Sequence, residues 1–93
     1  MRIGQVLAKK LTADGAVSAG PGKVWAVTVI SDGANAGSVV LKDGGATGAE
    51  MWRIDVPATA GATETVTFPR GLSFETSIYA DLTNVAAVYV AYT

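Results

Sequence analysis

The stretch that decides the fold is residues 23–30, which read Lys-Val-Trp-Ala-Val-Thr-Val-Ile. Its β-branched residues favour an extended strand, because their stiff side chains pack well on a pleated surface. Alternate residues of a strand share a face, and both faces here are apolar: Trp25, Val27 and Val29 on one, Val24, Ala26 and Ile30 on the other. A strand that is apolar on both faces belongs in the middle of the protein or at a subunit contact.

Similar short runs recur on both sides of this stretch, separated by clusters of Gly, Asp, Asn and Pro, which is typical of an all-β protein. No long segment has the 3.6-residue apolar period of a helix. We predict strands at residues 5–11, 23–30, 38–42, 50–56, 62–68, 76–82 and 85–92, with a short piece at 72–74. We expect a surface loop at 14–22 and a corner at 69–71, because both are rich in Gly or Pro.

These elements predict a single all-β domain over residues 1–93. The expected architecture is a compact, jelly-roll-like β-sandwich of about seven to eight short antiparallel strands, with a small barrel as the alternative. The strand at 85–92 is apolar on both faces, like that at 23–30. Residues 62–68 place a row of threonines outward, which suits an exposed strand.

Period-2 alternation also predicts the subunit core. Its members are the inward residues of the later strands: Trp52, Ile54, Val66, Phe68, Ile78 and Leu82. If Trp52 is fully buried, its replacement by alanine should cost about 3–5 kcal/mol.

Composition excludes several functions. Seven basic and eight acidic residues leave a net charge of -1, too weak a field to attract nucleic acid or an acidic membrane. The chain contains no cysteine and no histidine, so it lacks disulfides, thiolate metal sites, the usual general base and the commonest metal ligand. We therefore expect no catalytic residue, no cofactor and no metal site.

We expect neither a signal peptide nor a membrane-spanning segment. Lys9 and Lys10 interrupt any apolar run after the N-terminus. The longest apolar stretch near the C-terminus, 85–92, is far shorter than the roughly 20 residues of a membrane-spanning helix. We expect a soluble protein that is not secreted.

Two weaker chemical alternatives stay open. The carboxylates are scattered over turns and outward strand faces, so a carboxylate-only hydrolase would need distant residues to meet. No calcium-loop spacing is present, although a weak calcium site between loops would need only convergent oxygen atoms.

The apolar balance favours self-association. The chain is 49% hydrophobic, and a domain of this size buries only about 60–65% of its unfolded surface. Without disulfides or a metal, such small domains often gain stability by oligomerising. We expect a homo-oligomer, such as a trimer or pentamer, with Trp25, Val88 and Val90 near the subunit contact. Tyr79 is the one aromatic residue we place outward, facing a ligand.

Several segments carry a resemblance to a known class of protein: residues 23–29, 38–45, 57–63, 68–74 and 82–90. Together they resemble small virion-associated structural proteins of tailed bacteriophages. The resemblance covers about residues 20–92 and consists of strands and turns. It implies a self-associating capsid, head-decoration or tail component, located in the virion and bound to other virion subunits. It carries over no active-site residue.

A second class of function stays open beside it. Sandwich and jelly-roll folds often host binding loops, so the chain is alternatively a carbohydrate- or host-surface-binding module. In that case Tyr79 or Trp25 would contact the glycan.

Overall fold

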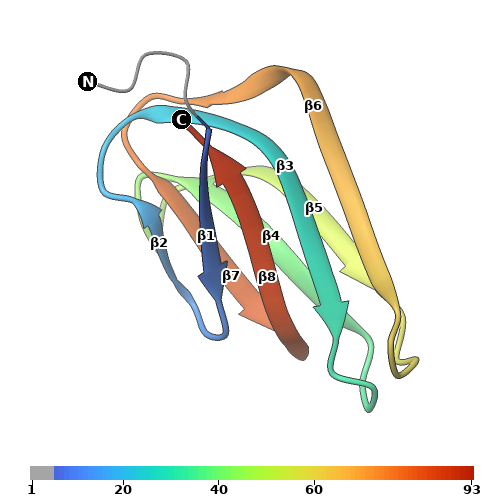
Figure 1. Cartoon of the computed structure of the whole chain (residues 1–93). Helices are drawn as coiled ribbons and strands as arrows, with labels where there is room; N and C mark the ends of the chain where they lie inside the picture. The colour runs from blue at the N-terminus through green and yellow to red at the C-terminus, as the bar shows by residue number, and fades with distance from the viewer. Residues whose placement is uncertain (1–5) are drawn as a thin grey trace.

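The strand predicted at residues 23–30 lies in the interior of a sheet. In a computed structural model, which describes residues 6–93, it is β3 (Gly22–Ser31) and pairs with β8 on one side and β6 on the other. β8 (Val85–Tyr92) lies between β1 and β3. The two doubly apolar strands are therefore neighbours in the interior of one sheet (Figure 1).

The described residues form eight antiparallel strands in two four-stranded sheets, which confirms the all-β sandwich. Sheet A has the order β1-β8-β3-β6 and sheet B has the order β2-β7-β4-β5. Of the seven connections, only that between β4 and β5 stays within one sheet, and each of the others crosses the sandwich, as in a jelly roll. The remaining strands are β1 (Leu7–Leu11), β2 (Gly15–Ser18), β4 (Gly37–Asp43), β5 (Ala49–Val56), β6 (Thr63–Phe74) and β7 (Ile78–Thr83).

Two elements differ from expectation. The predicted loop at 14–22 contains β2, a four-residue strand paired with β7; its small residues carry little strand propensity, so pairing with β7 decides its conformation. The predicted corner at 69–71 lies inside β6, which runs for 12 residues. Gly71 takes a φ of 73° there, and β6 bulges instead of ending, because glycine allows this left-handed backbone.

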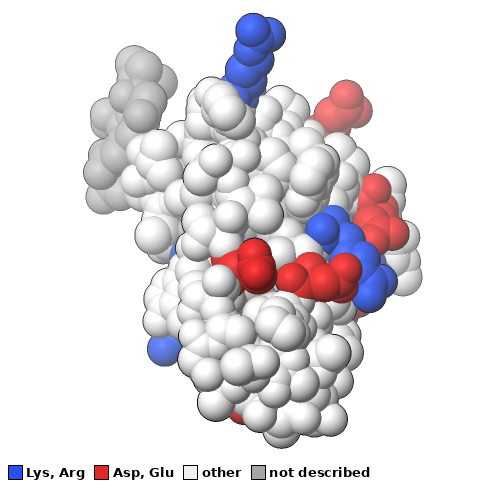
Figure 2. Space-filling view, turned by 90° about the vertical axis from the view of Figure 1, so that its right-hand side faces the viewer, with Lys and Arg blue, Asp and Glu red and all other residues white. Residues whose placement is uncertain are grey.

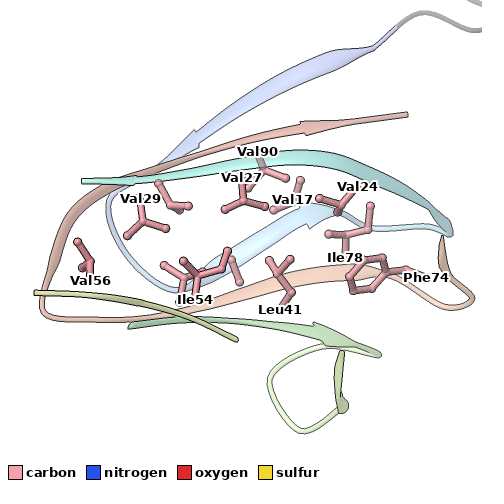
Figure 3. Packing of buried hydrophobic residues seen from close by; sticks show 13 residues of the cluster. Val17, Val24, Val27, Val29, Leu41, Ile54, Val56, Phe74, Ile78 and Val90 are labelled. Carbon is pink, nitrogen blue, oxygen red and sulfur yellow. The ribbon is translucent and has the colours of Figure 1, made fainter. Parts of the chain in front are cut away.

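The core fills the space between the sheets (Figure 3). Val27, Val29 and Val90 point inward from sheet A and meet Leu41 and Ile54 from sheet B. The largest side chains that are fully buried are Leu41, Ile78, Val24, Val27, Val29, Val39, Val88 and Val90.

The predicted core is partly correct. Ile54 and Ile78 are buried, and Val66, Phe68 and Leu82 pack against the core while keeping some exposure. The prediction that Trp52 belongs to the core is wrong, because its side chain is 44% exposed. Its register partner is the buried Leu41, so Trp52 does belong to the inner face, but β5 is an edge strand and no neighbour covers it on its outer side.

The face assignment of β3 also needs correction. A register shift separates Val24 from Ala26 in the pairing with both neighbouring strands. This β-bulge changes the face of the residues before it. Val24 therefore joins Val27 in the core, and Trp25 turns to the outer face with partial exposure.

Candidate interaction surface

Val88 and Val90 lie inside the protomer, which corrects their placement near a subunit contact. Both side chains are 0% exposed, and Tyr89 between them points to the solvent, at 42% exposed. Both faces of this strand are apolar in sequence, so alternation could not tell which one the opposite sheet covers.

Trp25 lies on the outer surface of sheet A and is half-buried. Its indole N–H donates to Thr93 Oγ1 at 3.1 Å, and the Lys23 ammonium lies 5.7 Å from its ring centroid. A Cβ atom on Gly71 would come within 3.3 Å of the Trp25 ring and 2.8 Å of the Lys23 side chain, and the φ of 73° at Gly71 favours glycine at this position. The role of Trp25 in a subunit contact stays a prediction.

Tyr79 is half-buried on the outer face of sheet B. In register it lies opposite Lys42 on β4, whose ammonium forms a 3.1 Å ion pair with Asp81. Trp25 belongs to the other sheet, so the two aromatic residues proposed to face a ligand do not form one platform.

The bulge of β6 borders a shallow hollow. It has a volume of about 370 Å³ and is lined by five consecutive residues, Phe68, Pro69, Arg70, Gly71 and Leu72. Between the pairs Val24–Leu72 and Ala26–Thr67, β6 contains more residues than β3, so the extra chain loops away from the sheet and leaves this depression.

Carboxylates in the described chain hold turns together. Asp43 at the end of β4 accepts backbone N–H groups from Glu75 at 2.9 Å, Thr76 at 2.8 Å and Ser77 at 3.2 Å. These bonds, above all that from Glu75, lower the pKa of Asp43 below its ordinary value. Asp32 similarly accepts N–H groups from Asn35 and Ala34, and these lower its pKa.

The acidic residues do not gather. Over residues 6–93, the structure brings together no group of three His, Cys, Asp or Glu side chains that could hold a metal ion. The same part of the chain contains no helix long and apolar enough to cross a membrane.

The sandwich has two open flanks, each between the edge strands of its two sheets. We call the side of β1 and β2 the β1/β2 flank, and the side of β5 and β6 the β5/β6 flank (Figure 1). On the β5/β6 flank, Trp52 packs edge-on against Phe68, with ring centroids 5.2 Å apart and an interplanar angle of 89°. Much of the surface seen from this side is uncharged, and acidic and basic side chains lie next to one another across its middle (Figure 2).

The pairing of β6 with β3 shows how the β6 backbone is oriented. The Ser31 N–H donates to the Ala62 carbonyl at 2.9 Å. Antiparallel ladders alternate between hydrogen-bonded and non-hydrogen-bonded pairs, so the pair Thr28–Thr65, three positions along the register, is of the second kind. Side chains lie closer in such pairs, and the two Oγ atoms are indeed 3.1 Å apart.

The same alternation identifies the free backbone groups of β6. Thr65 and the residues two positions away direct their N–H and C=O groups away from β3, and no other described strand pairs with that side. The free edge is therefore formed by Thr63, Thr65 and Thr67, whose side chains are also exposed. Sequence reasoning found these threonines as an outward row but had no signal that the strand was an edge.

Comparison with known proteins finds a similar chain among the solved structures. No family model matches the chain, and no curated protein matches it. Among solved structures it is similar to a chain described as "Bacillus endospore appendages form a novel family of disulfide-linked pili". The TM-score is 0.46 and the sequence identity 20%, over 100% of this chain and 94% of that one. The resemblance to phage virion proteins finds no support in these comparisons.

Proposed function

We propose that the protein is a non-enzymatic structural subunit that self-associates through the β5/β6 flank. One observation carries the proposal: Trp52, the larger of the two most exposed aromatic residues, lies on the inner face of an edge strand that has a paired neighbour on one side only. An inner-face aromatic residue that is 44% exposed gains burial when a partner covers the flank.

The rest of the flank supports the same proposal. Phe68 continues the aromatic surface of Trp52 onto β6, and the threonines of β6 offer unpaired backbone donors and acceptors beside it. Interfaces commonly combine a buried aromatic centre with hydrogen-bonding groups around it. The absence of histidine and cysteine from the chain fits a role in packing better than one in acid–base or nucleophilic catalysis.

The finer proposal is that the subunit belongs to a tailed-phage particle, where it binds other virion proteins. Its support is the sequence resemblance alone. It predicts that the purified protein co-sediments with phage particles or binds one of their isolated subunits. A protein that associates with itself but with no phage component would leave the structural role standing and remove the virion from the proposal.

The test of self-association is molar mass by light scattering behind a sizing column, over a concentration series. Tyr89 offers a matched control for Trp52, because it is similarly exposed, at 42%, but lies on a central strand. We expect an oligomer for the native chain and for Tyr89→Ser, and a shift toward monomer for Trp52→Ser. A monomer at every concentration of the native chain would contradict the proposal.

The hollow on β6 favours one second candidate, a glycan- or host-surface-binding module. Trp25 packs beside Gly71, which lines the hollow, and aromatic rings beside shallow depressions suit the apolar faces of sugars. A glycan array read with the native chain, Trp25→Ala and Tyr79→Ala would decide. Enrichment lost only in Trp25→Ala would place a glycan at the hollow; loss only in Tyr79→Ala would place it on sheet B.

A further inference from the structure

We infer that the free edge of β6 pairs antiparallel with β6 of a second copy, about a two-fold axis at Thr65. The inference rests on the proposed function and names the contact through which it works. In the pair, sheet A of one copy would continue into sheet A of the other.

The backbone register is self-complementary. The outward N–H and C=O groups belong to Thr63, Thr65 and Thr67, which are spaced evenly about Thr65. With the axis there, Thr65 faces the partner's Thr65 and exchanges both backbone hydrogen bonds with it. Thr63 then faces the partner's Thr67, and Thr67 faces the partner's Thr63. All six outward groups of each copy thus gain a partner.

The side chains fit the same register. Threonine faces threonine on the outer surface, a favourable cross-strand pair. On the inner surface Glu64, the one charged residue in 62–68, faces the partner's Val66. The two Glu64 carboxylates lie on a diagonal and not directly opposite, so their repulsion is moderate.

The other described edges are less suited to pairing. β1 is five residues long and contains Lys9 and Lys10. Lys9 shares the register position of the buried Val90, so it is an inward-facing charge, a common guard against edge pairing. β2 has four residues and an irregular register. β5 carries three charges, from Glu50, Arg53 and Asp55. Residues 62–68 of β6 carry a single charge, have high strand propensity and precede the bulge at Pro69 and Gly71.

This contact joins copies in pairs. An isologous interface uses the same surface on both subunits, so it predicts an even number of subunits in place of a trimer or pentamer. Trp52 lies on the same flank, packed on Phe68, and lies next to the new strand pair.

Single-cysteine cross-linking tests the axis, because the natural chain contains no cysteine to interfere. Cα atoms of a hydrogen-bonded antiparallel pair are about 5.5 Å apart, which a disulfide spans. Thr65→Cys should therefore form a disulfide dimer with itself under mild oxidation. Thr12→Cys, at an exposed threonine between β1 and β2, is the control for chance collision. We expect on the order of tenfold more dimer from Thr65→Cys, since pairing raises the local thiol concentration.

A second pair of variants tests the register. Thr63→Cys and Thr67→Cys should each cross-link poorly alone, because each residue lies four positions, about 13 Å, from its own copy across the axis. Mixed together, with one carrying a size tag, they should form a heterodimer as readily as Thr65→Cys forms its homodimer. Circular dichroism and denaturation of each variant confirm that it folds.

The outcomes separate the two proposals. A native oligomer in which Thr65→Cys cross-links no better than Thr12→Cys overturns the axis at Thr65 and leaves self-association standing. Equal cross-linking of Thr63→Cys alone and Thr65→Cys alone overturns the antiparallel register. A native chain that is monomeric at every concentration removes the proposed function and this contact with it.

Discussion

The two flanks of the sandwich differ in how far their edge strands are protected against pairing with another chain. On the β1/β2 flank both strands are short, β2 is irregular, and β1 carries Lys9 and Lys10. On the β5/β6 flank β6 is long, Glu64 is the one charge in 62–68, and Trp52 and Phe68 stay partly exposed. Edge pairing with another chain is a hazard that proteins usually block with charge, brevity or bulges. β5 carries three charges and β6 bulges at 69–71, but residues 62–68 of β6 carry a single charge and precede the bulge, so this segment is where we expect a partner.

The partial exposure of Trp52 does not indicate a poorly packed protein. Trp52 is opposite the fully buried Leu41 in the register, so it continues the core outward. The difference between the two residues is the presence of a neighbouring strand on each side of Leu41 and on only one side of Trp52.

The largest effect should come from breaking the core that both flanks share. Leu41→Ala removes a side chain that is 0% exposed and should lower the free energy of unfolding by about 2–5 kcal/mol. Val40→Ala, on the outer face of the same strand, should cost about 1 kcal/mol or less. Chemical denaturation measures both, and equal losses would contradict the assignment of faces in β4.

Trp52 tests the comparison of the two flanks, because one copy of the chain buries only part of its side chain. At concentrations where the protein is monomeric, Trp52→Ala should lower the free energy of unfolding by about 1–2 kcal/mol, from lost contact with Phe68. That is below the 3–5 kcal/mol expected from the sequence for a buried tryptophan. Denaturation with Tyr89→Ala in parallel provides the check; a loss above about 3 kcal/mol would mean that Trp52 is covered in the monomer.

Placing a lysine on β6 and removing the lysines of β1 should exchange the tendencies of the two flanks to associate with another chain. Thr65→Lys places like charges directly opposite each other across the proposed axis and should weaken association by about 1 kcal/mol. Lys9→Thr with Lys10→Thr removes the charges of β1 and should increase the apparent mass. Light scattering of the variants in low and high salt would measure both changes in association. If the Thr65→Lys variant dimerises as strongly as the native chain in low salt, the proposed two-fold axis at Thr65 is contradicted.

The anchor of β6 should be sensitive to acid. Asp43 holds the connection that follows β6 through N–H groups of Glu75, Thr76 and Ser77, and its pKa is lowered in the folded chain from the ordinary value of 3.8. A lowered folded pKa contributes stability above the unfolded pKa, and this stability is lost as the pH falls through the folded value. Asp43→Asn should therefore melt at a lower temperature than the native chain at neutral pH, with the difference shrinking in acid. A difference that is constant down to pH 2 would exclude this carboxylate as the cause.

The smallest effect should come from Glu64. The two Glu64 carboxylates face each other diagonally in the proposed pair, so Glu64→Gln should strengthen association by a few tenths of a kcal/mol, about 0.2–0.5. Sedimentation at low salt is sensitive enough to detect it. Glu50→Gln on β5 is the control, and an equal effect of both variants would indicate general charge reduction instead of a local contact.

Local sequence predicted the strands well where propensity and pattern agree. The runs that became β3, β4, β5, β7 and β8 were placed within a few residues, and the all-β sandwich followed from their spacing. β2 is not predicted because three of its four residues, Gly15, Ala16 and Ser18, have weak strand preference and Val17 alone favours a strand. The continuous course of β6 was missed because Pro69 and Gly71 usually end a strand, whereas here they form a bulge within it.

The residues of the candidate interaction surface are harder to predict from the sequence than the strands are. The sequence predicts Val88 and Val90 near a contact because both faces of their strand are apolar, whereas the packing of sheet B decides which face is inside. Alternation predicts Trp25 on the face of Val27, and the bulge between Val24 and Ala26 turns it to the other side. A register shift of one residue exchanges the two faces of a strand, and nothing in the local sequence marks where this one occurs.

The amino-acid sequence by itself determined the β class, the approximate strands, and the lack of histidine and cysteine chemistry, because these depend on residue type and near-neighbour pattern. The tertiary structure alone decided which strands are central and which are edges. That difference arises from pairing between residues distant in the chain, as between β3 and both β6 and β8. It determines that Leu41 is buried and Trp52 half-exposed although the two are register partners, and that the threonines of β6 keep a free edge.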